Sequence, residues 1–299
     1  MILNLIFVCH YCLRITINFN FKLILSYKTV FFLPLYIYME IQLKRFDIRD
    51  IKDDKVIVLI GKRDTGKSYL CKDILSHHTG IPAGQVISGT EAANSFYSKM
   101  VPKLFIYDEY EPGIIERLLK RQKMMIERAK ENPSTDPRAF LVFDDCLYDN
   151  TWTKDKNVRS LFMNGRHFKI LFMITMQYAL GIPPNLRTNI DYVFILRENY
   201  VSNRKRLYEH YAGMFPNFEM FCQVMDQCTE NYECLVIHNN AKSNKLTDQV
   251  FWYKADSHDD FRLCSQDHWQ YSATNEDKIR EEGGQQQSSS KYQITKSWS

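Results

Sequence analysis

The feature that most constrains this chain is a buried strand that leads directly into a glycine-rich loop and then into a helix. Residues 55–60 (KVIVLI) are a short apolar, β-branched run, as expected of a strand buried on both faces. Residues 61–68 (GKRDTGKS) match the G-x-x-x-x-G-K-[ST] pattern of a phosphate-binding loop. Residues 69–75 then continue as a helix. Because strand, loop and helix follow in this order, the segment predicts a nucleoside triphosphate site in an α/β fold.

Each residue type in the loop has a chemical function. Gly61 and Gly66 let the backbone curl so that its N–H groups face a β-phosphate, and the helix N-terminus adds partial positive charge there. Lys67 is predicted to contact β- and γ-phosphate oxygens, and the Ser68 hydroxyl to ligate Mg²⁺. The predicted ATP-binding residues are the whole loop and the residue after it: Gly61, Lys62, Arg63, Asp64, Thr65, Gly66, Lys67, Ser68 and Tyr69.

Two later segments compete to supply the acids that such a site needs at the end of a neighbouring strand. Residues 103–109 (KLFIYDE) end in Asp-Glu, and they could supply the acids if the strand order allowed. Residues 139–145 (AFLVFDD) are an uninterrupted apolar run that ends in Asp-Asp. We favour the second segment because another apolar strand, residues 168–175, follows within one helix length and leads to a polar residue.

The favoured segment assigns one role to each polar side chain. Asp144 is predicted to hold Mg²⁺ through water, and Asp145 to orient or deprotonate the attacking water. Gln177 is predicted to sense the γ-phosphate. Asp108 and Glu109 are interpreted as a solvated strand end with a packing or partner role.

Composition divides the chain into three parts. Residues 1–38 contain no acidic residue and three basic ones, and their longest uncharged run is shorter than the roughly 20 residues of a membrane span. Our hypothesis is that the working chain starts at Met39; a short membrane-associating extension is the alternative. Alternating apolar residues at 15–23 predict a strand there. Residues 39–264 are predicted to form one P-loop ATPase domain, and the polar residues 265–299 a disordered tail.

Net charge alone gives no indication of nucleic-acid binding. The chain carries a formal +4, of which the first 38 residues supply +3, leaving 36 basic and 35 acidic residues for the remainder. Any DNA contact must therefore be local. The candidates are a cluster at Lys120, Arg121 and Lys123 and a second cluster at residues 204–206, although such clusters are usually solvated helix faces.

Several segments, in the right order, resemble the genome-packaging ATPases of large nucleocytoplasmic DNA viruses, which belong to the HerA/FtsK group of P-loop motors. The resemblance covers about residues 45–255, and Asp64 departs from it because members often carry glycine there. The segments that carry it are residues 61–63 (GKR), 147–149 (LYD), 161–167 (LFMNGRH), 174–192 (ITMQYALGIPPNLRTNIDY), 234–238 (CLVIH) and 250–254 (VFWYK).

This resemblance implies a RecA/HerA/FtsK-like P-loop NTPase with a mostly parallel central sheet and helices on both faces. It further implies a homo-oligomeric ring that hydrolyses ATP with Mg²⁺, moves double-stranded DNA into a capsid and meets capsid or portal-site proteins. An arginine from the neighbouring subunit would complete each site, and Arg166, ahead of Arg187, is the candidate. The expected location is the host cytoplasm at the assembly site, the virion, or both, with no stable membrane span.

Two alternatives from other classes stay open. A small P-loop phosphotransferase, such as a nucleoside kinase, would need a lid and an acceptor pocket. A nucleotide-dependent capsid scaffold would bind ATP without hydrolysing it.

Overall fold

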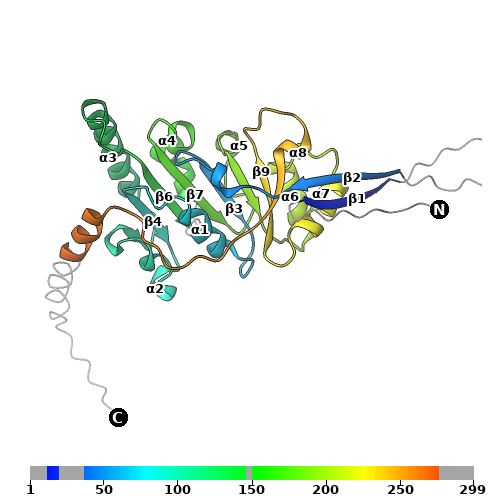
Figure 1. Ribbon diagram of the computed structural model, residues 1–299, viewed down its shortest axis with the longest axis horizontal. Helices are drawn as coiled ribbons and strands as arrows, with labels where there is room; N and C mark the ends of the chain where they lie inside the picture. Colours follow the sequence, from blue (N-terminus) through cyan, green and yellow to red (C-terminus); the bar gives the residue numbers. More distant parts are fainter. Residues whose placement is uncertain (1–11, 20–36, 146–149, 276–299) are drawn as a thin grey trace, which may run out of the picture.

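The computed structural model describes residues 12–19, 37–145 and 150–275. Its centre is an eight-stranded sheet in the order β10-β9-β8-β3-β7-β6-β4-β5 (Figure 1). The strands from β8 to β5 pair in parallel, whereas β9 and β10 add an antiparallel edge. The sheet's strands are β3 (Val56–Ile60), β4 (Gly84–Ser88), β5 (Ile106–Tyr107), β6 (Ala139–Asp144), β7 (Ile170–Met176), β8 (Tyr192–Ile195), β9 (Glu233–His238) and β10 (Val250–Lys254).

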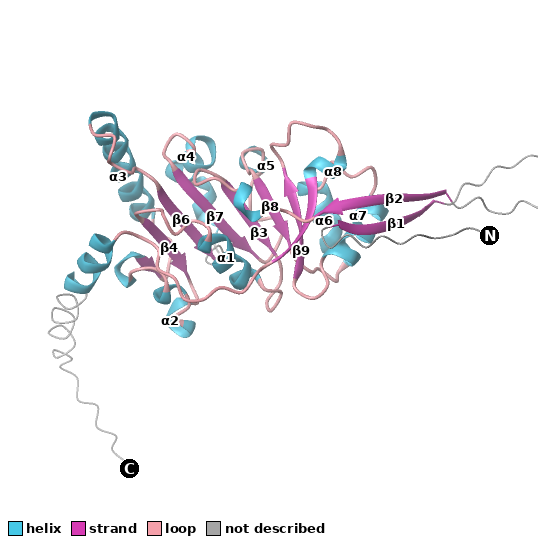
Figure 2. Ribbon diagram, viewed as in Figure 1, coloured by secondary structure: helices cyan, strands magenta, loops and turns pink. Residues whose placement is uncertain are grey.

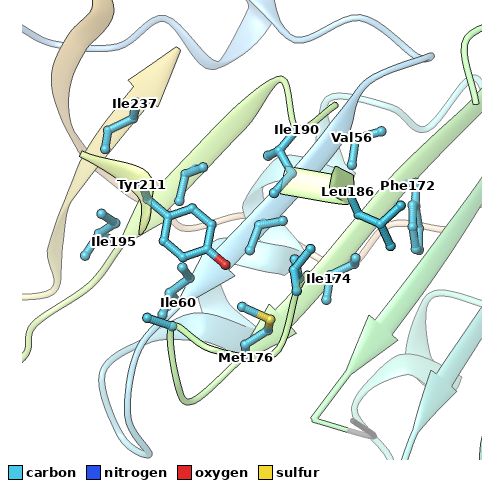
Figure 3. Packing of buried hydrophobic residues seen from close by; sticks show 14 of the residues in the cluster. Val56, Ile60, Phe172, Ile174, Met176, Leu186, Ile190, Ile195, Tyr211 and Ile237 are labelled. Carbon is cyan, nitrogen blue, oxygen red and sulfur yellow. The ribbon is translucent and has the colours of Figure 1, made fainter. Parts of the chain in front are cut away.

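Helices cover both faces of this sheet, as its apolar strands require. The residues of β3 alternate between two cores. Val56 and Ile60 belong to a cluster that includes Leu186 and Tyr211 (Figure 3). Ile57 and Leu59 belong to the other cluster, which includes Leu70. The helices are α1 (Lys67–Ser76), α2 (Glu91–Asn94), α3 (Pro112–Glu131), α4 (Lys156–Asn164), α5 (Pro184–Arg187), α6 (Val201–Tyr211), α7 (Phe218–Cys228) and α8 (Leu246–Gln249). Short 3₁₀ turns lie at Ile48–Asp50, Tyr97–Lys99, Lys103–Phe105 and Asn150–Lys154. The predicted fold class is confirmed.

The strand predicted over residues 103–109 is mostly wrong. Lys103–Phe105 is a 3₁₀ turn that follows Pro102, and only Ile106–Tyr107 pairs with β4 as β5. The physical reason is position, because β5 is an edge strand and pairs with the sheet on one side only. An apolar run alone does not reveal how many residues of it pair.

An antiparallel ribbon lies beside the antiparallel edge of the sheet and extends away from it (Figure 2). It pairs β1 (Cys12–Phe19) with β2 (Ile37–Lys44), so the strand predicted over 15–23 overlaps β1, and residues 20–23 lie outside the described part. β2 extends across the proposed start at Met39, which stays a prediction. Within the described ranges, no helix is both long and apolar enough to cross a membrane.

The C-terminal part of the described chain forms a hairpin and a helix. The hairpin consists of β9 and β10, and α8 lies in its connection. Residues 266–275, which composition places in the tail, are helical in the structure. This helix is held by a hydrogen bond from the Trp269 indole to the Leu263 carbonyl (2.8 Å) and one from Leu104 N–H to the Ser272 hydroxyl (3.1 Å). Residues 276–299 lie outside the described part.

Candidate active site

The glycine-rich loop connects β3 to α1 and needs its glycines for steric reasons. Gly66 has φ +97°, a left-handed conformation that costs glycine little. A Cβ on Gly61 would lie 2.8 Å from the Leu196 Cβ and 2.7 Å from the Thr65 hydroxyl, so no larger residue fits. Asp64 also has a positive φ, +61°, in the left-handed region that a residue with a side chain rarely adopts. The loop geometry is that of a phosphate cradle.

The Lys67 ammonium bonds to backbone carbonyls of this loop. It donates hydrogen bonds to the carbonyls of Gly61 (2.6 Å) and Lys62 (2.7 Å), and the Thr65 hydroxyl donates to the same Lys62 carbonyl (2.7 Å). Burial lowers the pKa of Lys67, while the nearby Asp145 and Asp144 carboxylates act in the opposite direction. The ammonium is therefore positioned between the loop and the acids, where an anion would be bound.

Asp144 is the last residue of β6 and is almost completely buried. The Thr175 hydroxyl, from the neighbouring strand β7, donates a hydrogen bond to its Oδ1 (2.7 Å). The Ser88 hydroxyl lies 3.5 Å from its Oδ2. Burial raises the pKa of Asp144, and the Thr175 and Tyr97 hydroxyls partly counteract this. Asp144 is thus an acid whose charge depends on donors from neighbouring elements.

Asp145 and Gln177 lie together one residue further along these strands. The Gln177 amide donates to both carboxylate oxygens of Asp145, at 2.8 and 2.7 Å. Asp145 itself has φ +48°, and its N–H donates to the Thr175 hydroxyl (3.1 Å). The two residues that the sequence predicts to act on water and on the γ-phosphate are therefore in direct contact.

Strand order explains why these groups meet. β7 lies between β3 and β6, so the carboxyl ends of all three strands place the loop, Gln177 and the two aspartates on one edge of the sheet. Asp108 and Glu109 follow β5, which is separated from β3 by three strands. This placement supports Asp144 and Asp145 over the competing pair.

Two oxygen donors at this edge of the sheet fit a magnesium ion. Ser68, in the first turn of α1, offers a hydroxyl, and Asp144 offers a carboxylate; these hard oxygen ligands suit Mg²⁺.

Among the described residues, Asp73, His77 and His258 form another group with metal-ligand chemistry, their ligand atoms within 4.8 Å of one another. Asp73 is already bonded there by His258 Nε2 (2.5 Å) and the Tyr253 hydroxyl (2.6 Å).

Neither candidate arginine contacts the loop of its own chain. Arg166 forms an ion pair with the buried Asp191, whose other carboxylate oxygen accepts the Val56 N–H at the start of β3 (2.9 Å). It therefore lies at the amino ends of the strands, opposite the loop. The Arg187 guanidinium lies over the Tyr211 ring, 5.7 Å from the ring centre. Their roles stay predictions.

The two basic clusters differ in which of their side chains are exposed to solvent. The Arg204 side chain is 13% exposed; it pairs with Asp226 (2.6 Å) and donates to the Glu198 carbonyl (2.6 Å). In that cluster the exposed cations are therefore Lys205 and Arg206. In the other cluster, Lys120 and Lys123 are exposed, whereas Arg121 donates to the Gln122 amide.

Sequence reasoning missed several residues beside the loop. Glu198 follows β8 and binds the Lys62 ammonium (2.6 Å), which also lies 3.6 Å from the centre of the Tyr200 ring. Burial raises the pKa of Glu198, but Lys62 and two further donors outweigh it, so the net pKa is lowered. Tyr232, in the turn between α7 and β9, lies over Gly66. Only the pairing of β8 with β3 could have identified Glu198.

No family model matches this chain. It is 40% identical over 223 residues to uncharacterized protein L437 of Acanthamoeba polyphaga mimivirus, covering 73% of this chain and 78% of that protein. It is 46% identical over 200 residues to uncharacterized protein 075L of Invertebrate iridescent virus 6, covering 66% and 76%. A relative in Frog virus 3, uncharacterized protein 015R, is 41% identical over 200 residues, covering 67% of this chain and 61% of that protein.

The fold matches that of the genome packaging NTPase B204 from Sulfolobus turreted icosahedral virus 2. The structure of B204 with AMPPCP superimposes with a TM-score of 0.51 and 17% identity, covering 69% of this chain and 100% of that chain. The sulfate complex of the same protein gives a TM-score of 0.50 at 17% identity, covering 69% and 99%. At this identity the likeness establishes the fold.

Proposed function

Because this chain belongs to the family of large-DNA-virus proteins that includes L437 and 075L, we propose that it is an ATP-hydrolysing motor for packaging double-stranded viral DNA. The observation that carries hydrolysis is the contact between Gln177 and Asp145 at the same sheet edge as the phosphate loop. The fold shared with a packaging NTPase supports the coupling to DNA. The predicted partners are therefore DNA, further copies of this chain in a ring, and capsid or portal-site proteins.

Each loop residue has a defined part in this proposal. When nucleotide enters, its anionic oxygens replace the Gly61 and Lys62 carbonyls as acceptors for Lys67. Ser68 and, through water, Asp144 would hold Mg²⁺, which neutralises charge on the β- and γ-phosphate oxygens.

Hydrolysis then depends on the pair formed by Asp145 and Gln177. Asp145 accepts a proton from the attacking water as the water oxygen bonds to the γ-phosphorus and the bond from that phosphorus to the β–γ bridging oxygen breaks, so that ADP and phosphate leave. The Gln177 amide, released from Asp145, donates to a γ-phosphate oxygen. The contact between these two side chains therefore keeps the base occupied until a γ-phosphate competes for the amide. Hydrolysis is thereby tied to the presence of a triphosphate.

The test is steady-state ATP hydrolysis by the full chain, with and without linear double-stranded DNA. We expect DNA to raise the wild-type rate, Lys67→Ala to lose nucleotide binding, and Asp145→Asn to bind ATP with kcat reduced at least about a hundredfold. Lys130→Ala, on the exposed C-terminal turn of α3, is the matched control and keeps wild-type activity.

The same experiment distinguishes a motor from the two alternative classes, a nucleotide-dependent scaffold and a phosphotransferase. Binding of ATP without turnover would identify a scaffold, and phosphoryl transfer to an added nucleoside with no response to DNA would identify a phosphotransferase. Either outcome would overturn the motor. Displacement of a third strand from a DNA triplex, dependent on ATP, would measure translocation directly.

A further inference from the structure

A hollow of about 450 Å³ opens beside the first turn of α1, next to the phosphate loop. This volume is within the usual range of small-molecule sites. Its lining is mostly apolar and aromatic and comes from three separate parts of the chain: Gly66, Tyr69, Tyr232, Lys254, Ala255 and Ser257. Neither the hydrolysis residues nor the predicted DNA clusters use it.

Two large aromatic side chains at this hollow are left uncovered. Tyr69 is 49% exposed and Tyr232 is 69% exposed. A tyrosine buries a large apolar ring readily, so two exposed rings facing one concave surface indicate a planar or apolar ligand. The hollow thus offers stacking area immediately after the phosphate-binding loop.

The backbone at Tyr232 is strained, and the Tyr232 ring lies over the loop. Asn231 and Tyr232 have φ of +52° and +65°, both in the left-handed region. Two consecutive left-handed residues that are not glycine cost stability, and such strain concentrates at functional sites. The Tyr232 ring lies 3.4 Å from where a Cβ on Gly66 would be, so glycine is also what allows this close approach.

Strand order gives the hollow an orientation relative to the acids. On one side of β3 lie β7 and β6, which carry Gln177 and the two aspartates. On the other side lie β8, β9 and β10; Tyr232 precedes β9, and Lys254 ends β10. A nucleotide whose γ-phosphate points toward the acids would therefore extend its base toward the hollow.

We propose that this hollow binds the adenine base of ATP, stacked on the Tyr232 ring and bordered by Tyr69. The proposal rests on the proposed function and adds the residues that select the base. Guanine recognition generally uses a carboxylate to accept from its ring N–H and amino group, and none occurs among the described residues that line the hollow. Lys254 and Ser257 offer donors to adenine ring nitrogens.

The experiment compares ATP with inorganic tripolyphosphate, which carries the phosphates but no base, by calorimetry on the full chain. Stacking on an aromatic side chain is worth enough that Tyr232→Ala should weaken ATP binding on the order of tenfold and leave tripolyphosphate binding unchanged. Tyr232→Phe keeps the ring and should bind ATP like wild type. Tyr271→Ala removes an exposed tyrosine far along the chain and is the matched control.

Each other outcome has a defined meaning. Equal weakening of ATP and tripolyphosphate in Tyr232→Ala, or no weakening of either, overturns the base site. Wild-type binding of GTP as tight as ATP overturns the assignment to adenine. If wild type binds tripolyphosphate as tightly as ATP, the proposed phosphate site stands and only the base site in the hollow is refuted. If wild type binds neither compound, the proposed function itself is refuted.

Discussion

At the residue scale, the most informative side chain is Asp144, an acid in surroundings that resist its ionisation. It is 5% exposed, and burial raises its pKa. The groups that face it are the hydroxyls of Thr175, Tyr97 and Ser88, together with Asp145 and Lys67. A carboxylate must be charged to hold a magnesium-bound water, so the donors around Asp144 set the pH at which the site can work.

Thr175→Val tests this dependence, because valine keeps the shape of threonine but cannot donate to the Asp144 carboxylate. Without that donor the pKa of Asp144 rises further, so Asp144 becomes protonated at a higher pH. On acidification the variant should therefore lose ATPase activity at a higher pH than wild type does. A hydrogen bond to a charged group is worth about 1.5–3 kcal/mol, so we expect the acidic limb of the kcat profile to move upward clearly. Thr175→Ser keeps the hydroxyl and serves as the control. Profiles of Thr175→Val and wild type that coincide between about pH 5 and 8 would contradict this role.

How far these residues could be predicted depends on what kind of signal placed them. Gly61 and Lys67 were predictable because the loop chemistry fixes their spacing, and Asp145 because an apolar strand leads into it. Glu198 and Tyr232 were not, since each follows or precedes a strand whose neighbour in the sheet is known only after folding. A positive φ at Tyr232 likewise leaves no mark in the sequence.

At the element scale, α1 connects the phosphate loop to the segment after β10. Asp73, on α1, is fully buried and accepts hydrogen bonds from the Tyr253 hydroxyl (2.6 Å) and the Asp256 N–H (3.2 Å). His258 Nε2 lies 2.5 Å from its other oxygen. These contacts fix residues 253–258, which include three lining residues of the hollow, against the helix that begins at the loop.

Asp73→Ala is therefore expected to destabilise the fold and to weaken ATP binding more than tripolyphosphate binding. Removing a buried acceptor leaves its donors unpaired, which costs roughly 2–4 kcal/mol in the free energy of unfolding. Urea denaturation measures the first effect and calorimetry the second. The control is Lys72→Ala, also on α1, whose ion pair with the exposed Asp260 (3.5 Å) should contribute less than about 1 kcal/mol. Equal stability of the two variants would refute the role of Asp73.

Helices were easier to predict than strand ends, and the reason is local. The helix predicted over residues 69–75 is observed within α1, Lys67–Ser76, because a helix is stabilised largely by contacts within its own segment. The extent of β5 depends instead on β4, to which it pairs for two residues. The helix at residues 266–275 was missed because its polar sequence hides the few contacts, such as that of Trp269, which hold it.

At the scale of the whole molecule, the sheet separates two sets of charged groups. The phosphate loop and acids lie at the carboxyl edge, whereas Arg166 and Asp191 lie at the amino edge of the same strands. Arg166 is therefore far from its own loop, and its side chain is 54% exposed. An arginine so placed can act in hydrolysis only on the site of another subunit, as a ring of identical chains would allow.

Mixing variants tests this arrangement. Arg166→Ala and Asp145→Asn should each be inactive alone. In an equimolar mixture, an Asp145→Asn subunit can supply its intact Arg166 to a neighbouring Arg166→Ala subunit, whose two aspartates are intact. With random assembly of a head-to-tail ring, about a quarter of the wild-type ATPase rate should return. The same mixture with Arg187→Ala examines the other candidate. If Arg166 only balances the buried Asp191, its variant unfolds at lower temperature and no mixture restores activity, because the defect then lies within the chain that carries it.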